Sequence, residues 1–232
     1  NIFDCIGGEC NTGICELRFA NGSTVKGACK NGAINGEAIM LYANGNLAYK
    51  GNMSENLPNG IGKIVYPDSS KYEGDFLKGK RNGKGKLTQA NGSQYTGMWL
   101  DNKKQGKGEW KDGDGNTYVG DFAKGDFDGY GKMVEKNGNI ITGIWKNNKL
   151  NGQATITEKD GHILTGTFIN DVINGKGEEI YANGDKYTGE FMNDQKAGRG
   201  TYQFKDGKKY TGTFENNLMN GNGIFTWPDG RV

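Results

Sequence analysis

The sequence predicts an all-β protein: a twisted antiparallel sheet of tandem β-hairpins, without a thick two-layer core and with almost no helix. A pattern of large and glycine residues returns every 23 residues, 41 of the 232 residues are glycine, and only 34% of the residues are hydrophobic. A fixed short period is the signature of architectures whose units pack on their neighbours. Many glycines and few aliphatic residues favour short strands and tight turns over a thick two-layer core. No segment shows a sustained helical period.

Each repeat opens with a large residue, has glycine two positions later and has a second large residue four positions after the first. The opening residues are Tyr49, Tyr72, Tyr95, Tyr118, Ile141, Leu164, Tyr187 and Tyr210. The second large residues are Met53, Phe76, Trp99, Phe122, Trp145, Phe168, Phe191 and Phe214. A further unit begins at Val25 and is one residue longer at 46–48, which predicts a bulge or a longer turn. We therefore expect residues 1–24 to form a degenerate, cysteine-containing capping repeat and residues 25–232 to form one continuous repeat domain.

Each unit is interpreted as two strands. Tyr72, Gly74 and Phe76 alternate along the chain, so their side chains share one face of a strand. Asn91-Gly92 predicts a hairpin turn. The segment 78–82 predicts a second, looser turn.

The expected strand register pairs large residues with glycines. If Tyr66 faces Tyr72 across the intervening turn, Ile64 opposes Gly74 and Gly62 opposes Phe76. The same register makes Leu87 oppose Gly97 and Gly85 oppose Trp99 in the next unit. Large side chains would then cover the bare backbone of glycines, which explains why glycine occupies strand interiors.

All four cysteines lie within the first 29 residues: Cys5, Cys10, Cys15 and Cys29. An even, clustered set predicts two disulfides and an oxidising compartment. The expected register places Cys15 opposite Cys29, and Cys5 with Cys10 would close the terminal turn. We therefore expect an exported protein (periplasmic, extracellular or at the cell surface). Four reduced thiols in a cytoplasmic protein are the alternative.

The charges are balanced and interspersed, with 29 basic and 27 acidic residues and a net charge of +2. This distribution argues against nucleic-acid binding, and no apolar run reaches the length of a transmembrane helix. A candidate basic contact patch for anionic lipid or an acidic partner comprises Lys78, Lys80, Arg81, Lys84, Lys86, Lys103, Lys104 and Lys107. A solvated surface is the plainer interpretation of these residues.

No residue pattern predicts catalysis, a metal site or a cofactor. Residues 74–81 resemble a phosphate-binding loop but lack the Ser or Thr that should follow the lysine. His162 is the only histidine and is expected on a surface turn. Asp112, Asp114 and Asn116 alternate like calcium ligands, but the closing glutamate of such a loop is missing. The cysteine spacings are unlike those of zinc fingers.

The unit Tyr-x-Gly-x-Trp/Phe, followed by Asn-Gly-x-Gly, resembles the MORN (membrane occupation and recognition nexus) repeat. Good copies span 72–92, 95–115, 118–138, 187–207 and 210–230, and the resemblance implies about nine to ten repeats forming an elongated single-layer sheet. Ile141 and Leu164 depart from the pattern. Candidate ligand-facing aromatics are Tyr72, Tyr95, Trp99, Tyr118, Trp145, Tyr187 and Tyr210, unless these rings only cover glycines.

The repeats predict a non-catalytic protein-interaction or scaffold module without a cofactor, whose partner is another protein or a second copy of itself. The resemblance implies two alternatives. One is a module that binds membrane surfaces or phospholipids. The other is the targeting region of a larger enzyme.

Overall fold

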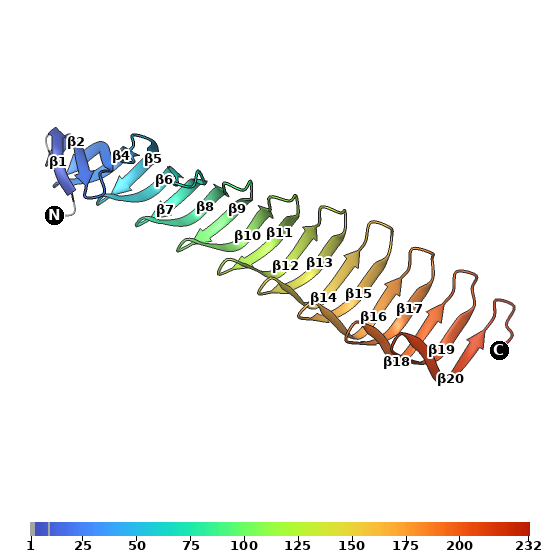
Figure 1. Ribbon diagram of the computed structural model, residues 1–232. Helices are drawn as coiled ribbons and strands as arrows, with labels where there is room; N and C mark the ends of the chain where they lie inside the picture. The colour runs from blue at the N-terminus through green and yellow to red at the C-terminus, as the bar shows by residue number, and fades with distance from the viewer. Residues whose placement is uncertain (1–2, 9) are drawn as a thin grey trace. The chain divides into compact units, whose positions relative to one another are not determined.

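The computed structural model describes residues 3–8 and 10–232; positions 1, 2 and 9 of the expected capping repeat lie outside it. These residues form twenty strands assigned to one antiparallel sheet, and no helix occurs among them (Figure 1). The predicted class, an antiparallel sheet of tandem hairpins, is therefore confirmed. Among the described residues there is also no helix that is long and apolar enough to cross a membrane.

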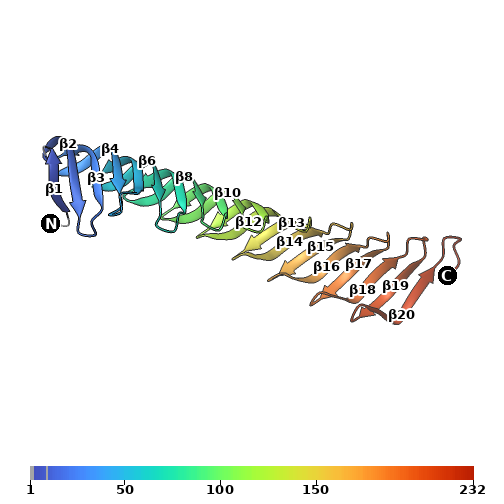
Figure 2. The same cartoon turned by 45° about the horizontal axis from the view of Figure 1, so that its top comes forward.

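The chain divides into two compact units, which are described separately. Unit 1 comprises residues 1–113 and 123–125, and unit 2 comprises residues 114–122 and 126–232. Unit 1 contains β1 (Phe3–Gly8), β2 (Thr12–Phe19), β3 (Thr24–Lys30), β4 (Ala33–Leu41), β5 (Leu47–Ser54), β6 (Leu57–Val65), β7 (Lys71–Leu77), β8 (Lys80–Thr88), β9 (Gln94–Leu100) and β10 (Lys103–Lys111). Unit 2 contains most of β11 (Thr117–Ala123), then β12 (Asp126–Val134), β13 (Ile140–Lys146), β14 (Lys149–Thr157), β15 (Ile163–Ile169), β16 (Val172–Ile180), β17 (Lys186–Met192), β18 (Gln195–Gln203), β19 (Lys209–Glu215) and β20 (Leu218–Thr226). In Figure 2 the labelled strands of unit 2 follow one another in sequence order.

The two kinds of hairpin turn differ from the sequence expectation. The turn predicted to be loose is the tight one: Lys78 and Gly79 have φ of 49° and 79°, and the flanking residues 77 and 80 pair directly. Left-handed backbone at both central positions is typical of a two-residue type I′ turn. The Asn91-Gly92 turn is a three-residue loop, closed where the Gln89 amide donates to the Ser93 carbonyl at 2.8 Å.

The predicted strand register was wrong by two residues. Ile64 opposes Tyr72, Gly62 opposes Gly74 and Gly60 opposes Phe76. The cause is the longer loop, because the Tyr66 amide donates to the Ser70 carbonyl at 2.8 Å and so closes the turn. Tyr66 is therefore used in the turn and does not pair with Tyr72.

The next hairpin shows the same offset from the expected register. Gly85 opposes Gly97, Leu87 opposes Tyr95 and Gly83 opposes Trp99.

Rings nevertheless cover glycines, by a different geometry. The Tyr72 ring leans along its own strand over Gly74 and over Gly85 on β8. A Cβ atom built on Gly85 would lie 2.2 Å from the Tyr72 hydroxyl oxygen and 2.4 Å from Cζ. The paired glycines thus provide the space that the ring occupies.

The extra residue at 46–48 is a bulge, as predicted. Leu41 pairs with Leu47 and Met40 pairs with Tyr49, so Ala48 is left without a direct register partner. The hairpins of the repeats also have irregular register beyond the paired glycines, for example between Gly74 and Phe76. In this hairpin the extra residues belong to β8, where residues 82–84 stand opposite Asp75 alone.

Each unit has two different faces. The core face carries the repeat aromatics, and the opposite face is called the outer face below. Tyr72 meets Phe76 and Trp99 edge to face, with ring centroids 5.0 Å and 5.4 Å apart. This edge-to-face geometry is the favoured one for aromatic pairs. The hydrophobic core of each unit is therefore a row of rings along one side of the sheet.

Candidate functional site

The candidate ligand-facing aromatics form the core. Tyr72, Tyr95, Trp99, Tyr118, Trp145, Tyr187 and Tyr210 are all between 0% and 5% exposed. The tyrosine hydroxyls are also used: those of Tyr72 and Tyr187 donate to the carbonyls of Asp75 and Glu190, three residues ahead, at 3.0 Å and 2.8 Å. A ligand would have to displace this packing to reach a ring face.

Burial also makes the tyrosine hydroxyls unsuited to acid–base chemistry at neutral pH. It raises the pKa of Tyr49, Tyr95 and Tyr187 to about 12. A phenol with so high a pKa stays protonated at neutral pH. These hydroxyls therefore serve as hydrogen-bond donors to the bulged backbone.

The eight residues of the candidate basic patch are not brought together on one surface. Arg81 and Lys104 lie on the core face, where the Arg81 guanidinium is 4.2 Å from the centroid of a Trp99 ring and the Lys104 Nζ is 5.4 Å from that of Tyr95. These distances are those of cation–π contacts. Lys84, Lys86 and Lys107 alternate with core-face glycines and lie on the outer face. Lys78, Lys80 and Lys103 flank or form the tight turns.

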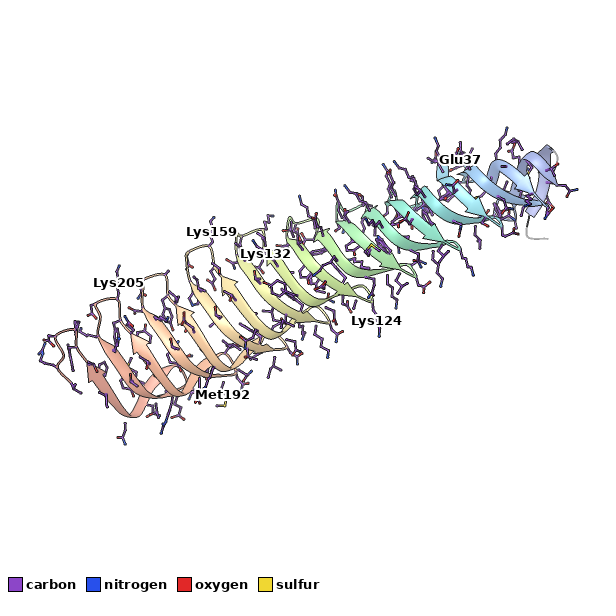
Figure 3. The ribbon with its side chains drawn as sticks, turned by 180° about the vertical axis from the view of Figure 1, so that it is seen from behind. Glu37, Lys124, Lys132, Lys159, Met192 and Lys205 are labelled. Atoms are coloured by element: carbon purple, nitrogen blue, oxygen red, sulfur yellow. A yellow bond between two sulfur atoms is a disulfide. The ribbon has the colours of Figure 1, made fainter. Side chains whose placement is uncertain are left out.

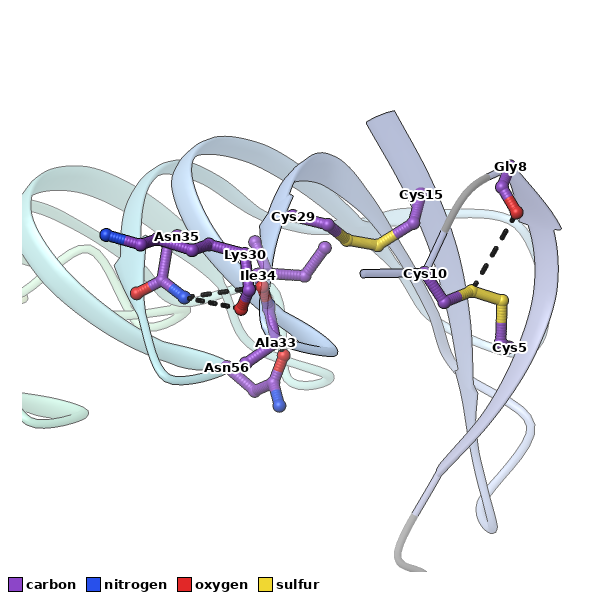
Figure 4. Close-up of a disulfide and its surroundings, with 10 residues drawn as sticks. All are labelled: Cys5, Gly8, Cys10, Cys15, Cys29, Lys30, Ala33, Ile34, Asn35 and Asn56. Carbon is purple, nitrogen blue, oxygen red and sulfur yellow. Dashed lines mark hydrogen bonds between the residues drawn. A yellow bond between two sulfur atoms is a disulfide. The ribbon is translucent and has the colours of Figure 1, made fainter. Parts of the chain in front are cut away.

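The four cysteines form two disulfides, Cys5–Cys10 and Cys15–Cys29 (Figure 4). The pairing agrees with the prediction, but the register behind it does not. Cys15 opposes Gly27 and Cys29 opposes Gly13, so the second bridge runs diagonally between β2 and β3. Cys15 is 1% exposed and Cys29 8% exposed, so this bridge takes the place of a ring in the core.

A polar cluster in unit 2 was missed by the sequence analysis. His162 was expected to be a plain surface residue, but its Nε2 lies 2.9 Å from Oε1 of Glu179 and its Nδ1 lies 3.5 Å from Oε1 of Glu158. Lys196 Nζ lies 2.8 Å from Oε2 of Glu179, and the Tyr181 hydroxyl donates to the same oxygen at 2.5 Å. The available signal was Glu179 itself, which stands where other repeats carry an apolar residue.

In this cluster the Glu179 carboxylate is compensated by hydrogen-bond partners and is largely enclosed. Burial by itself would raise the pKa of Glu179, but hydrogen bonds from Lys196, Tyr181 and His162 outweigh it and hold that pKa below its usual range. The side chains of Lys196 and Glu179 are 11% and 13% exposed. Within residues 3–8 and 10–232, no three His, Cys, Asp or Glu side chains are grouped so that they could hold a metal ion.

The outer face carries large apolar side chains that solvent reaches. In unit 1, Ile39 and Ile61 are 45% and 69% exposed. In unit 2, Tyr130 and Ile144 are 60% and 43% exposed and oppose each other on β12 and β13. Lys132, labelled in Figure 3, follows Tyr130 by two residues and extends from the same face.

The solved structures that resemble this chain are distant from it. No curated protein matches this chain. Among solved structures, the TCP domain of Drosophila melanogaster SAS-4 (dCPAP), in complex with a proline-rich motif of Ana2 (dSTIL), shares 13% identity, with a TM-score of 0.43 over 74% of this chain and 86% of that one. A variant of the Danio rerio CPAP TCP10 domain shares 15% identity, with a TM-score of 0.28 over 94% and 85%. Virginiamycin B lyase from Staphylococcus aureus shares 7% identity, with a TM-score of 0.17 over 92% and 88%. Similarity at this level carries no argument about function.

The sequence model of the MORN repeat matches nine consecutive segments: residues 30–47, 49–71, 72–94, 95–117, 118–140, 142–163, 165–186, 187–209 and 210–230. The segments cover most of the chain and coincide with the 23-residue repeat found in the sequence. They also follow the hairpins of the structure. The chain therefore belongs to the MORN repeat family.

Proposed function

We propose that this chain is a non-catalytic protein-interaction or scaffold module that binds its partners through the outer face. The observation that carries the proposal is the Tyr130–Ile144 pair in unit 2. These side chains oppose each other across β12 and β13 and are 60% and 43% exposed. The repeat aromatics, in contrast, are buried and already have partners.

An exposed aromatic beside a β-branched residue suits a binding anchor. Large apolar patches on an otherwise polar surface mark interaction sites, and tyrosine is among the residues that contribute most to interface energies. Full burial of a large apolar side chain contributes about 1.5–3 kcal/mol; since roughly half of each is already buried, covering the rest would contribute about 1 kcal/mol each. That is enough to anchor an interface completed by polar contacts around it.

The disulfides support the cellular setting proposed for this module. Two bridges near one end of a repeat array fit an oxidising compartment. We accordingly propose an exported protein whose N-terminal strands are stabilised covalently.

Site-specific photo-crosslinking tests the proposal. A photoreactive phenylalanine analogue at position 130 in the full chain, expressed in its own host, should give a discrete covalent adduct with another protein or with a second copy of the chain. Ile144→Asp should abolish the adduct, because it places a charge in the apolar interface. The same analogue at exposed Lys149, beside a tight turn, is the matched control.

Two results would overturn the proposal. One is the absence of any adduct specific to position 130. The other is co-sedimentation with anionic phospholipid vesicles that depends on Tyr130, which would favour the membrane-binding alternative. Light scattering on the purified chain would show whether the partner is a second copy.

A further inference from the structure

A row of outer-face residues crosses β3 to β6 in unit 1. The register places Lys26 opposite Ile39, Ile39 opposite Lys50 and Lys50 opposite Lys63. All four side chains are exposed. Across the four strands the row therefore consists of a lysine, an isoleucine and then two lysines that are directly opposite each other.

The Lys50–Lys63 juxtaposition is unfavourable by itself. Like charges directly opposite each other on one face of a sheet are destabilising. Lys63 is partly compensated, since its Nζ lies 3.6 Å from Oε2 of Glu73. The direct register partners of Lys50 are Ile39 and Lys63, neither of which is a carboxylate. Lys50 thus has no acidic residue directly opposite it, and Glu37 on the same face is a diagonal neighbour.

Apolar surface and a hollow lie beside these cations. Ile39 is 45% exposed, and Ile61, which precedes Lys63 by two residues on the same face of β6, is 69% exposed. A hollow of about 380 Å³ is lined by residues that include Lys26, Glu37 and Lys50. Glu37 is labelled on this part of the ribbon in Figure 3.

We propose that the outer face of β3–β6 binds an acidic polypeptide segment. Its carboxylates pair with Lys26, Lys50 and Lys63, and its apolar side chains cover Ile39 and Ile61. This inference rests on the proposed protein-interaction function and names the chemistry of a partner. Desolvated charge pairs around an apolar contact provide specificity as well as affinity.

A peptide fits this surface better than an anionic membrane does. The cations are interleaved with isoleucines at the spacing of neighbouring strands, about 4.8 Å. An extended segment presents every second side chain to one surface, so acidic and apolar residues placed two positions apart would face the lysines and isoleucines together. Glu37 and Glu73 lie on the same face and would repel a continuous anionic surface, whereas a peptide can place its carboxylates away from them.

Fluorescence anisotropy with the full chain tests the inference. The probe, called the Glu-Leu peptide, is a labelled repeat of Glu-Ser-Leu-Ser, in which Glu and Leu share one face of an extended strand. The Gln-Leu and Lys-Leu comparison peptides replace each Glu with Gln or Lys. The Glu-Leu peptide should bind, and binding should weaken with added salt. Lys50→Glu should reduce its affinity about tenfold or more. Lys132→Glu, an exposed outer-face substitution opposite Thr142 in unit 2, should leave the affinity within roughly twofold.

Thermal unfolding excludes a trivial loss of folding. Lys50→Glu removes a like-charge pair, so its melting temperature should be equal to or higher than that of the wild type. Reduced binding by a variant that is at least as stable would identify Lys50 as part of the site.

Three outcomes would overturn the inference. Equal binding of the Glu-Leu and Gln-Leu peptides would show that charge is not recognised. Lys50-dependent binding to anionic phospholipid vesicles without peptide binding would show that the occupant is a membrane. A Tyr130-specific protein adduct that persists, together with unaltered peptide affinity in Lys50→Glu, would refute this inference and leave the proposed function standing. Failure of both assays would refute both.

Discussion

The Tyr72 ring fills the space above Gly85, so any larger residue at position 85 would collide with the ring. Two ring atoms and the hydroxyl oxygen of Tyr72 would lie within 2.5 Å of a Cβ at position 85. The repeats themselves follow this dependence. Where the glycine equivalent to Gly85 is replaced, by Ala38 or Ala154, the residue equivalent to Tyr72 is Val25 or Ile141. The ring and the glycine therefore form one packing unit.

Gly85→Ala should destabilise unit 1 by about 1–3 kcal/mol, because the added methyl group overpacks the ring. Chemical denaturation would measure the change. Tyr72→Ile combined with Gly85→Ala should cost less than the sum of the two single changes, since the pair then copies Ile141 with Ala154. Gly166→Ala is the milder control, because its nearest neighbour is the flexible Ile173 Cδ1 at 2.6 Å. Strict additivity of the double change would contradict the packing unit.

The Asn102 side chain should stabilise its tight turn in two ways. Its φ is 69°, and its Oδ1 accepts the Arg81 amide at 2.8 Å. Asn102→Gly should lose only the hydrogen bond, at a cost of about 0.5–1.5 kcal/mol. Asn102→Ala should cost about 1 kcal/mol more, because alanine resists the left-handed backbone. Urea unfolding curves of the two variants would separate the hydrogen-bond contribution from the backbone contribution. Equal stabilities of the two variants would rule out backbone strain.

Loss of the Cys15–Cys29 bridge should lower stability by about 2–4 kcal/mol. The bridge spans 14 residues of sequence and lies in the core. Cys5–Cys10 spans only 5 residues and should contribute less, since a shorter loop loses less entropy. Thermal unfolding of Cys15→Ala/Cys29→Ala and Cys5→Ala/Cys10→Ala would test this order. Peptide mapping without reductant would check the pairing, and four alkylatable thiols would remove the case for export.

Unit 2 should lose stability in acid through Glu179. Its folded pKa is held below the ordinary value of 4.5, so folding favours the charged carboxylate. The resulting stability is complete above the unfolded pKa and disappears as the pH falls from about 4.5 through the folded pKa. Glu179→Gln should flatten the pH dependence of urea unfolding across that acidic range. Glu178 is the matched control, because it forms a more exposed ion pair with Lys186. Glu178→Gln should retain most of the pH dependence. An unchanged slope in Glu179→Gln would contradict this assignment.

Much of the candidate-site interpretation could not come from the sequence. The repeat identified Tyr72 and Gly85 as structural positions, because each repeat needs a large residue and a small one. It could not distinguish a ring that faces a ligand from one that is buried. That distinction depends on how the side chains of neighbouring strands pack against the ring. Likewise, nothing along the chain singles out His162. Its contact with Glu179 forms because β16 lies beside its turn, and β18 brings Lys196 to the same carboxylate.

The 23-residue period and the alternation within each strand were enough to predict the hairpin sheet, because both depend on local spacing, and the motif of each repeat resembles the MORN repeat. The cysteine pairs were also predicted, although Cys15 was paired with Cys29 from a register that the structure corrects. The register required the structure. Tyr66 closes a three-residue loop instead of pairing with Tyr72, and this choice between turn types shifts the pairing by two residues. A shift of two keeps each side chain on its face but changes its neighbour. That is why ring burial over glycine could be anticipated, whereas Lys50 opposite Lys63 became visible only once the strands were paired.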